Sequence, residues 1–127
     1  MKPKKIAVVD NDAPVRAALA TLLAAAGYEV DCHASAESFL ASGRLGSADC
    51  LLVDVRMPGM TGVELQQHLE RMGAAIPIVF MTGQAAANVR IAGTVELLEK
   101  PFSDDALIGA IERAAAQSSA RTRPATK

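Results

Sequence analysis

Short apolar runs alternate along the chain with longer segments in which apolar residues recur at helical spacing. This alternation is typical of repeated strand–helix units, in which helices cover both faces of a parallel sheet. Three of the runs are continuously apolar, as central strands of such a sheet are. They are residues 6–9 (IAVV), 50–53 (CLLV) and 78–81 (IVFM). We therefore expect an α/β fold with these three runs at the centre of its sheet.

Two further runs have the composition of edge strands. Residues 28–32 (YEVDC) alternate, so that Tyr28, Val30 and Cys32 share one face and acidic residues occupy the other. Residues 95–99 (VELLE) are interrupted by glutamates, and charge discourages pairing at a sheet edge. Five strands of these two kinds suit a doubly wound (βα)5 flavodoxin-like fold. This is a three-layer sandwich with a parallel sheet in the order 2-1-3-4-5.

The helices between these strands have recognisable starts. Serine, threonine and aspartate are strongly preferred as N-cap residues, and a glutamate three positions later completes a capping box. The predicted helices, each with its capping residue, are 13–26 (Asp12), about 35–42 (Ser35), 62–72 (Thr61, boxed by Glu64) and about 104–117 (Ser103). We expect residues 1–117 to form one domain and residues 118–127, which have no apolar periodicity, to be a mobile tail or a truncated linker.

Polar residues follow four of the predicted strands at the points where they end. Asp10 and Asn11 end the first strand, Asp54 the third, Thr82 the fourth and Lys100 the fifth. In a doubly wound sheet the ligand site lies at the carboxyl ends of the strands, beside the point where strand order reverses. We expect these five residues to converge on one rim.

The residue types on this rim suit phosphoryl transfer. Crowded carboxylates repel one another unless a cation joins them, and Mg²⁺ prefers oxygen ligands while leaving room for a phosphoryl oxygen. Lys100 adds a positive charge and Thr82 a hydroxyl. A carboxylate nucleophile, a metal ion and an ammonium group are the parts that phosphoryl transfer needs. Asp54 is then the predicted phosphate acceptor.

The composition narrows the possible partners and compartments. Thirteen basic and fourteen acidic residues in 127 give a net charge of −1, so no overall field attracts nucleic acid or a membrane. No apolar stretch approaches the ~20 residues needed to span a bilayer. Cys32 and Cys50 lack the spacing of a zinc site, and we expect reduced, partly buried thiols. These features predict a cytoplasmic protein that binds neither nucleic acid nor membranes through this chain.

Four motifs give the chain a resemblance to a known family. They are VVDND (8–12), LLVDVRMPGMTG (51–62), PIVFMTG (77–83) and EKPF (99–102). In combination they resemble the receiver domains of two-component response regulators, over residues 4 to about 116. The resemblance implies a phosphorylation-controlled switch that catalyses only its own phosphorylation and dephosphorylation. It also implies that a histidine kinase or phosphotransfer protein donates the phosphate and that a downstream effector domain or protein receives the signal. A weak homodimer is compatible with the resemblance.

The resemblance also implies a role for each matching residue. Asp54 matches the phosphorylated aspartate, Lys100 the phosphate-contacting lysine and Thr82 the switch hydroxyl. Asp10 and Asn11 occupy the positions of an acidic pair that holds Mg²⁺ together with Asp54. The backbone carbonyl of Arg56 is a further implied Mg²⁺ ligand. A cis peptide is implied between Lys100 and Pro101, although only about 5–6% of X–Pro bonds are cis.

Three departures from the family pattern leave alternatives open. Asn11 replaces a usual acid, Leu97 a usual aromatic residue, and the connection from Thr82 to Lys100 is shorter by about one helical turn. We therefore expect weaker Mg²⁺ binding and a shortened fourth helix at about 86–92. One alternative is a receiver-like interaction module that works without phosphorylation. A phosphohydrolase acting on small molecules is disfavoured because Arg56 stands where such enzymes commonly place a second acid.

Overall fold

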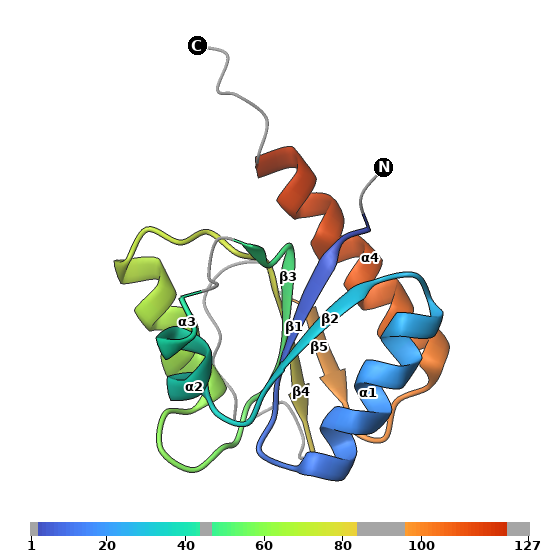
Figure 1. Cartoon of the computed structure of the whole chain (residues 1–127), viewed down its shortest axis with the longest axis horizontal. Coiled ribbons are helices and arrows are strands. Elements are labelled where there is room, and N and C mark those ends of the chain that lie inside the picture. The colour runs from blue at the N-terminus through green and yellow to red at the C-terminus, as the bar shows by residue number, and fades with distance from the viewer. Residues whose placement is uncertain (1–2, 44–46, 84–95, 122–127) are drawn as a thin grey trace.

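The computed structural model describes residues 3–43, 47–83 and 96–121. Five parallel strands form one sheet in the order β2-β1-β3-β4-β5 (Figure 1), which confirms the predicted α/β doubly wound order. The strands are β1 (Lys5–Val9), β2 (Glu29–His33), β3 (Cys50–Asp54), β4 (Ile78–Thr82) and β5 (Glu96–Glu99). The continuously apolar strands β1, β3 and β4 lie in the middle, where both faces of the sheet are covered.

The helices begin where the capping residues predict. They are α1 (Ala13–Ala25), α2 (Ala36–Ala41), α3 (Gly62–Arg71) and α4 (Asp104–Arg121). Side chains of Asp12 and Ser35 accept hydrogen bonds from the first turns of α1 and α2. Thr61 and Glu64 form the predicted capping box at the start of α3. Ser103 Oγ accepts a 3.0 Å hydrogen bond from the amide of Ala106 at the start of α4.

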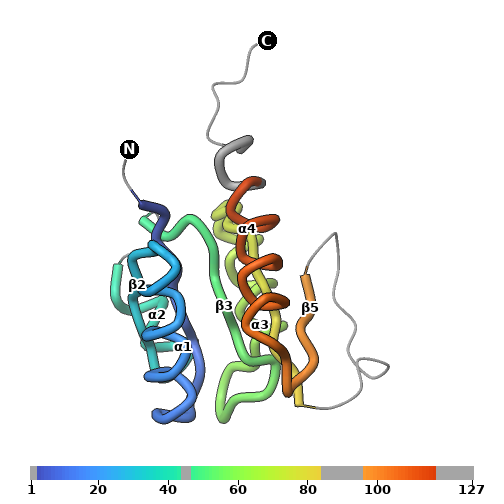
Figure 2. Tube along the Cα trace, turned by 90° about the vertical axis from the view of Figure 1, so that its right-hand side faces the viewer, coloured from blue at the N-terminus to red at the C-terminus, as the bar shows by residue number. Residues whose placement is uncertain are grey.

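Two apolar layers hold the helices against the sheet. α1 and α4 pack on one face, through a cluster that includes Leu23 and Ile111. α2 and α3 pack on the other, through a cluster that includes Phe39 and Leu65. Figure 1 shows the two helix pairs on opposite sides of the sheet, and Figure 2 looks onto the face that carries α1 and α4. The result is a three-layer sandwich.

The predicted partial burial of Cys32 is wrong. Its side chain is exposed, whereas Cys50 in the central strand β3 is buried. Cys32 lies near the end of β2, an edge strand that only β1 borders, so little structure covers that position. The next residue, His33, points to the opposite face and is buried, with its ring centroid 5.2 Å from that of Phe39 in α2.

The last helix is longer than predicted. α4 continues to Arg121, past the predicted end at 117, so residues 118–121 are helical. Buried Ile111 and Ala115 anchor the helix, and extending an existing helix is far easier than starting one. None of the helices in the described part of the chain is long and apolar enough to cross a membrane. The proposed short helix at 86–92 lies outside the described residues, as does the segment 122–127.

Candidate functional site

The polar strand ends meet at one edge of the sheet. Asp10 follows β1, Asp54 ends β3 and Thr82 ends β4. Lys100 follows β5, and its amide donates a 2.7 Å hydrogen bond to the carbonyl of Thr82. The parallel register pairs Val9 with Val53, next to Asp10 and Asp54. The sheet therefore brings these strand ends to one rim.

Lys100 joins the two carboxylates of this rim. Its Nζ lies 3.4 Å from Oδ2 of Asp54 and 3.7 Å from Oδ2 of Asp10. The lysine side chain is 30% exposed and that of Asp54 14%, so both can be reached from solvent. The predicted grouping of these three side chains is thus present.

Asp10 is the fully buried member of the group. Its Oδ1 accepts a 2.9 Å hydrogen bond from the amide of Asp12, while its Oδ2 is buried without a hydrogen-bond partner. Burial raises the pKa of this carboxyl above its ordinary value. The charge of Asp54 also raises this pKa, whereas the bond from Asp12 and the charge of Lys100 lower it. A second cation beside Oδ2 would favour the charged form.

The donors on this rim fit a magnesium ion. Mg²⁺ takes oxygen ligands, keeps several waters and needs only one or two carboxylates from the protein. Asp10 offers an unbonded buried oxygen, and Asp54 stands on the adjacent strand. Among the described residues no three His, Cys, Asp or Glu side chains are grouped for metal binding. A metal here would thus rely on two carboxylates together with amide, backbone or water oxygens.

The loop after Asp54 is held close to its carboxylate. The amide of Arg56 donates a 3.2 Å hydrogen bond to Oδ1 of Asp54, and the amide of Gly62 donates a 3.0 Å bond to the carbonyl of Val55. A Cβ atom at Gly62 would lie 2.7 Å from the backbone oxygen of Asp54. Only glycine lets the start of α3 approach β3 this closely.

Asn11 and Arg56 lie at the mouth of the site. Both are exposed, and with Met57, Pro58 and Thr61 they line an open hollow of about 380 Å³. The hollow places Asn11 opposite the loop that follows Asp54. Metal ligation by the amide of Asn11 and by the backbone carbonyl of Arg56 stays a prediction.

Thr82 and Pro101 complete the rim. Thr82 is buried as the last residue of β4, next to β5, which leads directly to Lys100. The peptide between Lys100 and Pro101 is cis, as the family resemblance implied.

Two residues near the site have roles that the sequence pattern does not reveal. Arg16 of α1 donates a 2.6 Å hydrogen bond from Nη1 to the carbonyl of Asp10. Glu37 of α2 accepts a 2.9 Å hydrogen bond from the amide of Met60, in the loop after Asp54. Arg16 is six positions after Asp10 in the sequence, and this spacing predicts a contact between them only weakly. Glu37 and Met60 are 23 positions apart, and no pattern relates them.

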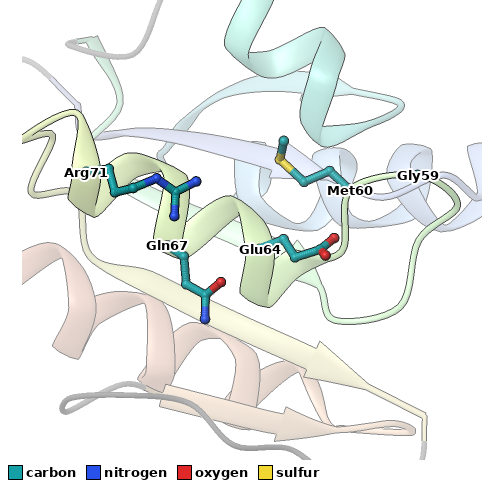
Figure 3. Close-up of a pocket in the computed structure, with 5 residues that line it drawn as sticks. All are labelled: Gly59, Met60, Glu64, Gln67 and Arg71. Carbon is teal, nitrogen blue, oxygen red and sulfur yellow. The ribbon is translucent and has the colours of Figure 1, made fainter.

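A second hollow lies beyond this loop, along α3. It encloses about 350 Å³ and is lined by Gly59, Met60, Glu64, Gln67 and Arg71. Figure 3 shows Glu64, Gln67 and Arg71 on successive turns of α3, with Gly59 and Met60 in the loop that leads into the helix. The loop after Asp54 thus forms part of the wall of both hollows.

The sequence matches characterised proteins over most of its length. Residues 6–112 match the family described as response regulator receiver domain. The chain is 37% identical over 113 residues to the response regulator protein TodT of Pseudomonas putida, covering 86% of this chain and 50% of TodT. It is 42% identical over 111 residues to the transcriptional regulatory protein FixJ of Rhizobium meliloti, covering 84% of this chain and 54% of FixJ. The chain therefore spans about half the length of these curated relatives.

Solved structures share the fold. The response regulator StyR superposes with a TM-score of 0.87 at 41% identity, over 95% of this chain and 63% of that one. The structure titled FixJ-N superposes with a TM-score of 0.80 at 39% identity, over 91% of this chain and 96% of that one. The second match covers nearly all of the FixJ-N chain.

Proposed function

This chain belongs to the response regulator receiver domain family, and on that premise we propose that it is a phosphorylation-controlled switch of a two-component system. Asp54 accepts the phosphoryl group. The donor is a histidine kinase or a phosphotransfer protein, and the phosphorylated form of this protein signals to an effector domain or protein. The only reactions in this proposal are the protein's own phosphorylation and dephosphorylation.

One observation carries the proposal. Lys100 Nζ lies within 4 Å of carboxylate oxygens on both Asp54 and Asp10, and the Asp10 oxygen is buried without a hydrogen bond. A buried carboxylate is costly unless it is paired and hydrogen-bonded or coordinates a metal. A site that retains this oxygen beside a second carboxylate and an ammonium group is suited to bind a metal and a phosphoryl group.

The proposed reaction moves one phosphoryl group. A carboxylate oxygen of Asp54 attacks the phosphorus of a phosphohistidine, a new O–P bond forms, and the P–N bond to the donor imidazole breaks. The imidazole nitrogen then takes a proton from solvent. The product is an acyl phosphate, which water later hydrolyses to inorganic phosphate and the free carboxylate. The backbone amide of Arg56 holds the attacking carboxylate in position through the hydrogen bond that it donates to Oδ1 of Asp54.

Positive charge on the rim favours this transfer because negative charge gathers around the phosphorus. Lys100 supplies one such charge directly beside Asp54. Asp10, Asp54, the Asn11 amide and the Arg56 carbonyl would hold Mg²⁺, which would neutralise phosphoryl oxygens when bound. The hydroxyl of Thr82, at the end of the neighbouring strand, is the group proposed to respond to the new phosphoryl oxygens.

Incubation with acetyl phosphate tests this proposal. In the presence of Mg²⁺, intact-protein mass spectrometry should show one added phosphate on the wild-type chain. Asp54→Asn should abolish the adduct, and Asp49→Asn, another aspartate beside β3, should retain it. An adduct that persists in Asp54→Asn would refute the assignment.

The alternative is an interaction module that works without phosphorylation. Asn11 favours it, since an amide at the mouth of the site supplies one negative charge fewer for Mg²⁺ than a carboxylate would. A wild-type chain that takes up no phosphate from either acetyl phosphate or a phosphorylated histidine kinase would support this alternative.

A further inference from the structure

The loop that follows the phosphoacceptor makes a contact that none of the proposed chemistry uses. Glu37, in the first turn of α2, accepts a 2.9 Å hydrogen bond from the amide of Met60. Neighbouring Gly59 has a φ of +75°, a conformation that favours glycine, and a Cβ there would lie 2.7 Å from Oε2 of Glu37. The carboxylate therefore sits directly against the far end of the loop.

α2 provides a firm base for this contact. Its residues Ala36 and Phe39 are fully buried in the cluster that covers this face of the sheet, and Ser35 caps its start. The Glu37 side chain itself lies in solvent, yet the hydrogen bond from Met60 lowers the pKa of its carboxyl. The lowered pKa agrees with a carboxylate that is charged when it binds the loop.

The loop is thus held at three points. The Arg56 amide donates a hydrogen bond to Asp54 at its start, and the Gly62 amide, just past its end, donates one to the carbonyl of Val55. Glu37 holds Met60, near its end. Between these points, Arg56, Met57 and Pro58 form one wall of the hollow that faces Asn11.

We propose that Glu37 is a positioning residue for the phosphorylation site, which holds the loop of residues 55–61 so that the backbone around Arg56 stays in place for metal and phosphate binding. This inference rests on the proposed function of that loop. Glu37 touches neither Asp54 nor the proposed ligands, and it acts only through the backbone of Met60. Removing the hydrogen-bond partner of a metal ligand typically lowers the metal affinity about 10–100-fold. Removing a contact one step further away should lower it less.

Three substitutions separate the contact from the charge. Glu37→Gln keeps an oxygen at the same reach without the charge. Glu37→Asp keeps the charge in the first turn of α2, where it favours the helix, but its side chain is one methylene shorter. Glu37→Ala removes both, and Glu70→Ala removes an exposed glutamate from α3 as a matched control.

The experiment measures hydrogen exchange of the Met60 amide, the dissociation constant for Mg²⁺ alone, and the rate of phosphorylation by acetyl phosphate. We expect Glu37→Ala and Glu37→Asp to lose Met60 protection and to raise the Mg²⁺ dissociation constant about three- to tenfold, less than a direct partner of a ligand would. Glu37→Gln should stay within about twofold of wild type. All three Glu37 variants should unfold at the same midpoint temperature as Glu70→Ala.

Several outcomes would overturn the inference. Unchanged Mg²⁺ affinity in Glu37→Ala would show that the loop needs no clamp, and equal losses in Glu37→Gln and Glu37→Ala would show that charge rather than contact matters. The proposed function fails separately, because it predicts that the wild-type chain takes up phosphate. If the wild-type chain binds Mg²⁺ without taking up phosphate, the Met60 exchange and Mg²⁺ affinities still decide the role of Glu37.

Discussion

Lys100 Nζ lies 3.4 Å from Oδ2 of Asp54, although the two residues are 46 positions apart in the sequence. Asp54 ends β3 and Lys100 follows β5, and these two strands are not neighbours, since β4 lies between them. The lysine side chain crosses the end of β4 to reach the carboxylate, and it approaches Asp10 of β1 as well. One ammonium group thus links the ends of three strands.

Loss of this ammonium group should slow phosphorylation. Lys100→Ala should reduce the rate with acetyl phosphate about 10²–10³-fold, the range seen when one preorganised electrostatic donor is removed. Lys5→Ala, at the opposite end of β1, is the control and should keep the wild-type rate. The rates can be followed by intact mass. An unchanged rate in Lys100→Ala would mean that Lys100 does not contact the transferring group.

A carboxylate at position 11 should strengthen Mg²⁺ binding. Asn11→Asp adds a negative charge near the proposed ion, and a unit charge pair at 4 Å is worth about 1 to 4 kcal/mol between effective dielectrics of 80 and 20. Repulsion from Asp10 and Asp54 offsets part of this gain. Isothermal titration with MgCl₂ checks the prediction. If the variant binds no tighter, Asn11 points away from the metal.

Glycine at position 62 should be required for the fold around Asp54. Gly62→Ala places a Cβ 2.7 Å from the backbone oxygen of Asp54, and such overpacking costs about 1–3 kcal/mol. Gly109→Ala is the matched control, because its Cβ meets only Arg113 Nη1 at 3.4 Å within α4. The control should stabilise the fold by about 0.5–1 kcal/mol, since alanine is the better helix former. Urea unfolding measures both changes, and equal effects would contradict the close approach.

The two cysteines should differ sharply in reactivity. Desolvation by neighbouring atoms raises the pKa of both thiols, and the complete burial of Cys50 raises its pKa to about 12. At pH 8 a thiol with that pKa is ionised in only about one molecule in 10⁴, and the thiolate is the reactive form. A disulfide reagent should therefore modify the exposed Cys32 in the native protein, and Cys50 only after unfolding. Rapid modification of both in the native state would be inconsistent with the buried position of Cys50.

The arrangement of strands and the start of each helix could be predicted from the sequence. Continuous apolar runs predict β1, β3 and β4 because a strand covered on both faces can carry no charge in its interior. Asp12, Ser35 and Thr61 predict helix starts because their side chains bind backbone amides within three residues. Patterns of this kind are local, so the sequence displays them directly.

The sequence also predicts which strand ends meet, because parallel strands of one sheet end at the same edge. Asp10, Asp54 and Lys100 were predicted together on that basis, and the structure joins them within 4 Å. The sequence could not predict that one oxygen of Asp10 lacks a hydrogen bond, since that depends on every neighbouring atom.

Contacts at the edge of the sheet and in the loop after Asp54 depend on the tertiary structure and could not be predicted from the sequence. Cys32 has the alternation of a half-buried strand, yet it is exposed, because burial depends on what covers the end of an edge strand. From the sequence, Glu37 is expected to be an ordinary exposed glutamate. In the structure, the packing of Phe39 brings its carboxylate against the amide of Met60. Periodicity reports which face of an element is apolar, whereas the position of a neighbouring element follows from the packing of the whole core.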